Sequence, residues 1–395
     1  MAGRGRVWRI GAAGLCLLLP LTGCGGRTAA DSARAEVQHV LDRRAAALVA
    51  HDASAYGETG TRAEYARLRA LPLASWSYRV TGVHRTSSGA TADADLRYRV
   101  AGYDRAPVDV RRTLTLGRGA GGAWYVTADR PARRAGQQLW DQGTVTAVEG
   151  ARSLVLGTGR PRAELRAFAR MADRAAPAVS HEWGTDWSGR VVVLVPRSLA
   201  GMAGLLGSPA SDYRGIAAVT TGEAGGSGRT PADRVVVNPE AYAGLGDVGK
   251  QVVLTHETTH VATRAHTTAA TPLWLSEGYA DWIGYLGAGR APRAIAPELA
   301  RAVQDGRAPG ALPGDKDFGF TGDPTELAQA YESGWLACRM IADDWGAARL
   351  GAFYRAVGAH GKRPGAVEQA LRKVLGTTPQ RFTARWRDYV TKRLG

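Results

Sequence analysis

The segment that most constrains this chain is His256-Glu257-Thr258-Thr259-His260. Its surroundings favour a helix, on which residues four positions apart lie on the same face. His256 and His260 therefore present two imidazoles to one point, as a zinc ion with nitrogen ligands at about 2.0–2.1 Å requires. Glu257 lies beside them, where its carboxylate takes a proton from water without binding the metal. The pattern predicts one catalytic zinc ion with Glu257 as the general base.

A catalytic zinc site needs a third protein ligand and an open position. Two residues compete for the third position, His266 and Glu277. His266 stands at the metzincin spacing, His-Glu-x-x-His-x-x-Gly-x-x-His, but Thr263 occupies the place of the glycine at which that chain turns sharply. A metzincin also needs a later methionine turn, and the surroundings of Met340 favour a helix. We therefore favour Glu277 and keep His266 as the alternative.

Glu277 belongs to the segment Trp274-Leu275-Ser276-Glu277-Gly278-Tyr279-Ala280-Asp281. We expect this segment on the next helix, antiparallel to the first because the connecting loop, 267–271, is short. Asp281 shares a helix face with Glu277. There its carboxylate can accept the second N–H of a ligating histidine and fix the tautomer.

Together the two segments resemble the gluzincin, or peptidase MA-like, zinc metallopeptidases, which include thermolysin-like enzymes and the large aminopeptidases. The resemblance covers roughly residues 145–395. It implies that His256, His260 and Glu277 bind zinc, that Glu257 is the general base, and that Asp281 orients a histidine. It also implies a peptide or protein substrate and a mixed sheet whose edge strand binds it, followed by the active-site helices.

A further segment, 330–335, resembles the one that carries an oxyanion-stabilising tyrosine in the aminopeptidase-like branch, which implies that role for Tyr331. A tyrosine that only packs between helices is the structural alternative, and His360 is another candidate donor. Aminopeptidases of this superfamily also carry a Gly-x-Met-Glu-Asn segment whose glutamate holds the substrate amine. No such segment precedes His256. Glu240 is a candidate substitute, and a helix-capping or surface acid is the simpler interpretation of it. The sequence therefore favours an endopeptidase or a dedicated activity.

The N-terminal residues have the pattern of an export signal. A basic start with Arg4, Arg6 and Arg9 precedes a short apolar run, 10–21, that ends in Leu21-Thr22-Gly23-Cys24. These four residues resemble a bacterial lipobox, which implies a signal peptide at 1–23 and a lipid on Cys24. We expect an exported protein that is lipid-anchored to the outer face of the membrane, with a plain secretory signal as the alternative. No apolar stretch is long enough for a permanent membrane-spanning helix.

The rest of the chain predicts an α+β fold in two domains after a tether at 24–33. Residues 34–132 combine one helix with alternating strands between 74 and 130, and resemble the cystatin-like cone of nuclear transport factor-like domains. We interpret them as a spacer or binding domain. Residues 145–395 predict a small mixed sheet and then a mainly helical region, and the Gly-rich segment 213–230 predicts a mobile loop. We expect strands at 144–156, 191–195 and 234–237, and helices at 34–50, 162–176, 247–264, 272–286, 324–345, 347–358, 365–374 and 378–394.

Net charge and cysteine content bear on the partners and the disulfide bonds that we expect. The net charge of +15 is spread along the chain, so we expect no nucleic-acid partner outside the cytoplasm. Cys338 is the one cysteine after Cys24, which predicts a small buried side chain and no intramolecular disulfide. Two other functions stay open: a catalytically inactive lipoprotein that uses the zinc-stabilised fold as a binding scaffold, and a metal-dependent cell-wall amidase. The oligomeric state is also open.

Overall fold

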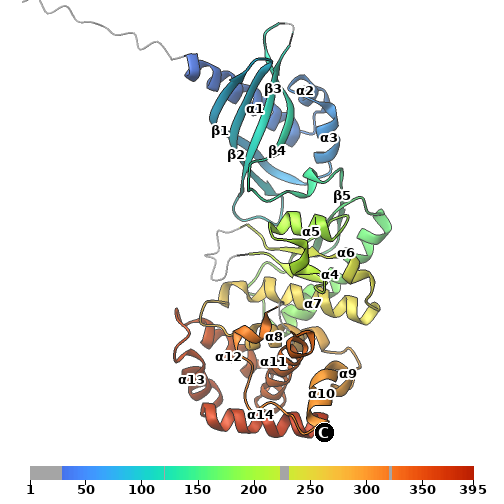
Figure 1. The fold of residues 1–395 in the computed structure, drawn as a ribbon, viewed down its shortest axis with the longest axis vertical. Helices are drawn as coiled ribbons and strands as arrows, with labels where there is room; N and C mark the ends of the chain where they lie inside the picture. Colours follow the sequence, from blue (N-terminus) through green and yellow to red (C-terminus); the bar gives the residue numbers. More distant parts are fainter. Residues whose placement is uncertain (1–28, 120, 223–230, 320–322) are drawn as a thin grey trace, which may run out of the picture.

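The structure is a computed structural model, which describes residues 29–119, 121–222, 231–319 and 323–395. Three parts follow one another along the long axis of the molecule: a four-stranded sheet with its helices, a five-stranded sheet, and a helical region that ends the chain (Figure 1). The expected α+β fold is confirmed. The expected signal peptide and Cys24 lie outside the described residues, and within those residues no helix has the length and apolar character to cross a membrane.

The first part is an antiparallel meander with α1 (Ala29–Val49) packed along it. The inward positions of its strands alternate with exposed ones, so that Trp76, Tyr78 and Val80 are buried on one face. Residues 29–33, expected as tether, form the start of α1, and two short helices were not expected, α2 (Ala53–Glu58) and α3 (Arg62–Leu68). The strands are β1 (Leu73–Thr86), β2 (Gly89–Val100), β3 (Val108–Arg118) and β4 (Trp124–Pro131), in that order across the sheet.

The second sheet is mixed and has the order β5-β6-β7-β9-β8. Its three central strands are parallel, and the two edge strands run antiparallel to their neighbours. The expected strands at 191–195 and 234–237 are confirmed. The loop expected at 213–230 is wrong at 218–220, which form β8, and its residues 223–230 lie outside the described residues. The strands are β5 (Val145–Glu149), β6 (Ser153–Thr158), β7 (Val191–Val195), β8 (Ala218–Thr220) and β9 (Arg234–Val237).

The central strand β7 is an unbroken apolar run because both of its faces are covered. Val191, Val193 and Val195 pack against the helices on one side of the sheet. Val192 and Leu194, on the other side, join the hydrophobic core of the first part of the chain. The 34–132 region thus covers one face of the second sheet and shares its core.

A buried ion pair joins the same two regions. The side chain of Asp104, which follows β2, is fully buried and both of its carboxylate oxygens accept hydrogen bonds from Arg234 Nη2, at 2.8 and 2.9 Å. Oδ1 also accepts the backbone N–H of Ala232 at 3.0 Å. Asp104 therefore holds the start of β9 in place.

Helix α4 (Arg162–Trp183) covers the other face of the sheet and is longer than expected. Our prediction ended it at residue 176. The next residue, Pro177, lacks the N–H that continues a helix, and a proline inside a helix costs about 3 kcal/mol. The extra turns bury Val179 and Trp183, and each large apolar side chain gains about 1.5–3 kcal/mol on burial. The free energy gained by burying Val179 and Trp183 therefore exceeds the cost of Pro177 inside the helix.

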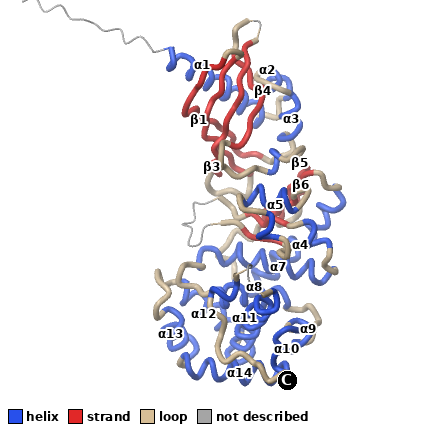
Figure 2. Tube along the Cα trace, in the orientation of Figure 1, coloured by secondary structure: helices blue, strands red, loops and turns tan. Residues whose placement is uncertain are grey.

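Two short helices, α5 and α6, lie at the level of the second sheet (Figure 1), and the helices from residue 247 onward fill the lower half of the molecule (Figure 2). The predictions for α7, α8, α11, α12 and α14 are confirmed within one or two residues, and Gly246 is the N-cap of α7. The helix expected at 365–374 is α13 followed by a π-helical turn, Leu371–Leu375. These helices are α5 (Leu199–Leu206), α6 (Pro239–Ala243), α7 (Asp247–Thr263), α8 (Leu273–Tyr285), α9 (Pro292–Ile295), α10 (Pro297–Gln304), α11 (Pro324–Trp345), α12 (Ala347–Gly358), α13 (Ala366–Ala370) and α14 (Pro379–Leu394).

Candidate metal centre

Helices α7 and α8 bring three candidate ligands together. His256 Nε2 and His260 Nε2 lie 3.0 Å apart, and Glu277 Oε2 lies 3.3 Å from the first and 3.4 Å from the second. Within the described residues this is the one group of three histidine, cysteine or acidic side chains with the spacing of a metal site. All three side chains are mostly buried, with 14–18% of their surface exposed.

The donor set fits a zinc ion. Ligands at about 2.0–2.1 Å from a tetrahedral zinc lie roughly 3.3–3.4 Å from one another, which is close to the three separations here. Two imidazoles and one carboxylate are also the ligand types of catalytic zinc sites, which leave the fourth position open. The residues present therefore match the chemistry that the sequence pattern predicts.

The local sequence explains how α7 carries two inward histidines. Thr258 and Thr259 are fully buried β-branched residues, which lower helix propensity. Each hydroxyl donates to the carbonyl one turn earlier, Leu254 O at 2.6 Å and Thr255 O at 2.8 Å, so no buried hydroxyl is left unpaired. The histidine face of the helix stays free for the site.

Asp281 orients His256. The Nδ1–H of His256 donates to Asp281 Oδ1 at 2.8 Å, which turns Nε2 toward Glu277. Burial disfavours the charged form of His256, but the Asp281 and Glu277 carboxylates raise its pKa well above the usual value. Burial would raise the pKa of Glu277, but His260 and His256 hold it well below its usual value. The carboxylates thus create a field that attracts a cation to the imidazoles.

Glu257 points its carboxylate toward the edge strand β8. Thr220 Oγ1 donates to Glu257 Oε2 at 2.6 Å and lies 3.1 Å from the backbone oxygen of the same residue. Glu257 as a whole residue is 7% exposed. Sequence reasoning missed Thr220, because three strand residues between Gly-rich segments carry no periodic signal.

Tyr331 reaches the site because α8 and α11 pack closely. A side chain at Gly278 would meet the backbone of Gly334, and one at Gly334 would meet the backbone of Trp274, so only glycines allow this approach. Tyr331 lies one turn before Gly334 and lines the same cavity as His256 and Glu257. Burial first, and then the Glu277, Asp281 and Glu257 carboxylates, raise the pKa of Tyr331 far above its usual value, so the phenol keeps its proton.

The cavity beside the site has a volume of about 650 Å³. Its walls come from β8 and the preceding segment and from α7, α8, α9 and α11. Its apolar surface includes Ile216, Val252, Ile295, Leu327 and Trp335. A cleft of this size and lining accepts an apolar side chain next to the candidate metal centre.

The residues that the sequence offered as alternatives lie elsewhere. His266 follows α7, and its Nε2–H donates to Asp186 Oδ2 at 2.9 Å. Glu240 Oε1 accepts the backbone N–H of Leu199 at 3.0 Å, at the start of α5, which makes it a helix cap. His360 follows α12, where its backbone carbonyl accepts a hydrogen bond from Thr268 Oγ1 at 3.0 Å. Cys338 is fully buried, as expected.

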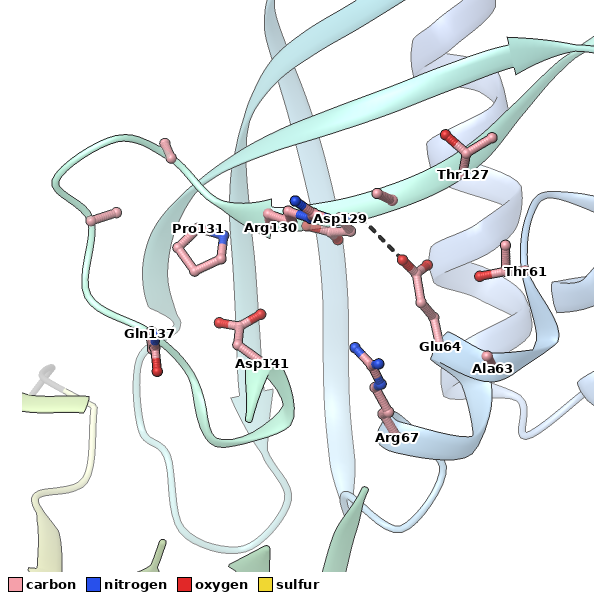
Figure 3. Close-up of a pocket in the computed structure, with 13 residues that line it drawn as sticks. Thr61, Ala63, Glu64, Arg67, Thr127, Asp129, Arg130, Pro131, Gln137 and Asp141 are labelled. Atoms are coloured by element: carbon pink, nitrogen blue, oxygen red, sulfur yellow. Dashed lines mark hydrogen bonds between the residues drawn. The ribbon is translucent and has the colours of Figure 1, made fainter. Parts of the chain in front are cut away.

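A larger cavity, of about 800 Å³, lies in the first part of the chain (Figure 3). Its carboxylates already have partners. Arg112 pairs with Asp129 at 2.6 Å and with Asp141 at 2.7 Å, and Glu64 Oε1 accepts the backbone N–H of Asp129 at 3.0 Å. Because these carboxylates already have hydrogen-bonding partners, we assign them a structural role. The candidate metal ligands and the candidate general base are those on α7 and α8.

No protein-family model and no curated protein matches the chain. Among solved structures it is similar to an M1 zinc metallopeptidase from Deinococcus radiodurans with a bound Tyr-Ser-Ala substrate, at 16% identity, 81% coverage of this chain, 62% coverage of that chain and a TM-score of 0.34. A two-domain M1 zinc metallopeptidase with bound L-arginine matches at 16% identity, 82% and 63% coverage and a TM-score of 0.35. The chain spans about three fifths of the length of these structures.

Proposed function

We propose that this chain is a zinc-dependent peptidase whose metal is held by His256, His260 and Glu277. The observation that carries the proposal is the triangle of two imidazole nitrogens and one carboxylate oxygen, at 3.0, 3.3 and 3.4 Å. Its separations suit one zinc ion, and a glutamate adjacent in sequence to the first histidine lines the same cavity.

A zinc ion held by His256, His260 and Glu277 would lower the pKa of a bound water molecule and polarise a carbonyl oxygen. Glu257 accepts the proton of the attacking water and passes it to the leaving amine. Asp281 keeps His256 in the tautomer whose Nε2 is free to ligate, through its 2.8 Å hydrogen bond. Tyr331, which stays protonated, donates a hydrogen bond to the developing oxyanion.

The surroundings of the site favour an extended peptide with an apolar side chain. β8 is the edge of its sheet, and within the described ranges no other strand pairs with its outer side. Exposed strand edges bind extended peptides through backbone hydrogen bonds. The apolar cavity beside His256 then receives one side chain of the bound peptide.

The acidic residues near the cavity favour an endopeptidase over an aminopeptidase. A substrate amine would need a carboxylate free to bind it. Both oxygens of Glu332 accept backbone N–H groups at the start of α10, from Leu299 at 2.6 Å and from Glu298 at 3.3 Å. Asp281 is engaged by His256, and Glu240 caps α5. Asp212 also lines the cavity, but it is exposed and accepts a hydrogen bond from Ser211 Oγ at 3.0 Å. Among the described residues that line the cavity, no buried acid is therefore free to bind an amine.

The remaining parts of the proposal rest on the sequence. The lipobox-like segment that ends at Cys24 supports export and a lipid anchor on the outer face of the membrane. We propose residues 34–132 and 145–395 as the two domains, with the second carrying the chemistry. A peptidase held outside the membrane meets extracellular proteins and wall peptides as substrates.

The test compares zinc-loaded wild type with Glu257→Gln on a peptide library, on casein and on purified cell wall, with released amines as the readout. We expect wild type to cleave peptides and Glu257→Gln to lose this activity at equal zinc content. Release from cell wall alone would identify a wall amidase instead. Stoichiometric zinc in both proteins with no cleavage of any substrate would identify a binding scaffold and overturn the proposal.

A further inference from the structure

We propose that Thr220 is a positioning residue that sets the orientation of the Glu257 carboxylate. The inference rests on the proposed function, since it assigns Thr220 a role in the work of the general base. It comes from a contact between two elements far apart in the sequence, the edge strand β8 and the active-site helix α7. Thr220 Oγ1 lies 2.6 Å from Glu257 Oε2.

The hydroxyl has two acceptors within reach and one proton to donate. The second acceptor is the backbone oxygen of Glu257, at 3.1 Å. A hydrogen bond to an ionised carboxylate is shorter and stronger than one to a neutral carbonyl, so the proton goes to Oε2. The shorter distance, 2.6 Å, is indeed the one to the carboxylate oxygen, and the longer, 3.1 Å, is the one to the backbone oxygen. Thr220 thus donates to the side chain of the base.

This bond engages only one of the two carboxylate oxygens. Among the described residues, Thr220 supplies the sole side-chain hydrogen bond to the Glu257 carboxylate, and it reaches Oε2 alone. A glutamate side chain has three rotatable bonds, and a single fixed oxygen removes most of its freedom to turn. The hydroxyl therefore holds Oε2 and leaves Oε1 as the oxygen that takes the proton from water.

The donor itself is held on a strand. Thr220 pairs with Val235 of β9, and the next residue, Thr221, donates its backbone N–H to Arg234 O at 2.8 Å. Arg234 is fixed in turn by the buried carboxylate of Asp104. Groups placed on regular elements with supporting contacts are positioned more accurately than groups on loops. The position of the hydroxyl thus depends on the sheet and, through Asp104, on the 34–132 region.

The same residue also borders the proposed peptide site. β8 is the last strand of its sheet, so an extended substrate that pairs with its outer edge runs next to Thr220. One strand residue then lies against both the peptide backbone and the general base. This arrangement aligns the scissile bond with the free oxygen of Glu257.

The experiment uses full-length protein carrying Thr220→Val, which keeps the branched shape and removes the hydroxyl, and Thr220→Ser, which keeps the hydroxyl. We expect Thr220→Val to lower kcat on the order of 10- to 100-fold, as for other small misplacements of a catalytic group, with KM and zinc content unchanged. Thr220→Ser should restore most of kcat. Thr127→Val is the matched control and should keep the wild-type kcat, because it removes an exposed strand hydroxyl in the other sheet, on β4. Thr220→Ala replaces the valine variant if the latter does not fold.

A second readout does not depend on activity. Crystal structures of the metal-free proteins should show the Glu257 carboxylate in one orientation in wild type and Thr220→Ser, and displaced in Thr220→Val. An active wild type with equal kcat in Thr220→Val overturns this inference and leaves the peptidase proposal intact. An inactive wild type overturns the peptidase proposal, and the position of Glu257 in the crystals still decides the role of Thr220.

Discussion

Asp281 accepts the Nδ1–H of His256 at 2.8 Å, from a position one helical turn beyond Glu277. The second helix thus supplies both a candidate metal ligand and the group that orients another ligand. A single rigid element fixes their relative positions. We expect the loss of either carboxylate to weaken metal binding. The loss of Glu277 should weaken it more, because Glu277 is a candidate ligand and Asp281 only orients one.

Asp281→Ala should lower zinc affinity roughly 10- to 100-fold, because His256 loses the acceptor that fixes its ring. Competition against a chromogenic chelator measures this change. Asp388→Ala, at an exposed site on α14, is the control and should bind zinc like wild type. Equal affinity in both variants would show that Asp281 does not support the site.

Tyr331→Phe should lower kcat about 100-fold without changing zinc content, since it removes one donor to the oxyanion. Steady-state kinetics on a cleaved peptide measure the loss. Tyr285→Phe is the matched control, because Tyr285 lines the same cavity but belongs to α8. If both variants keep wild-type kcat, Tyr331 only packs between helices.

Elements with a clear apolar pattern were predicted from the sequence, and the shortest strand was missed. The 22-residue helix α11 and the apolar strand β7 were placed correctly, since each carries its own periodic or continuous apolar signal. The metal triangle was predicted from spacing, because helix geometry places His256 and His260 on one face. β8 was missed, because a three-residue edge strand depends on its pairing with β9.

Contacts between distant segments account for the other differences. Thr220 and Glu257 are brought together by the packing of β8 against α7, which no local pattern encodes. The pairing of Asp104 with Arg234 likewise joins regions that the sequence suggested were independent. Long-range packing also carries α4 through Pro177.

Asp104→Ala should destabilise the protein by about 3–5 kcal/mol, because it leaves the mostly buried guanidinium of Arg234 without its carboxylate partner. The free energy of unfolding in urea measures the effect. Asp109→Ala is the matched control: Asp109 pairs with Arg97 at 2.8 Å, but both side chains are more than half exposed. Its loss should change stability by at most about 1 kcal/mol. Equal effects would mean that Asp104 does not bind the two regions together.

Glu332 should make stability depend on pH. Burial raises its pKa from 4.5 to about 7, against the hydrogen bonds from Leu299 and Glu298. Between these two values the folded state binds a proton that the unfolded state has released, so the free energy of unfolding falls as pH rises from 4.5 to about 7. The Tm of wild type minus that of Glu332→Gln should therefore decrease across this range and level off above it. A constant difference would refute the assignment.

The central claim is that α7 and α8 form one zinc site. Anomalous diffraction at the zinc edge from zinc-loaded crystals tests it most directly. We predict a single protein-bound peak about 2.0–2.2 Å from His256 Nε2, His260 Nε2 and a carboxylate oxygen of Glu277, and no such peak in Glu277→Ala. A peak at His266 and Asp186 instead, or a site that survives Glu277→Ala and is lost in His266→Ala, would contradict the account.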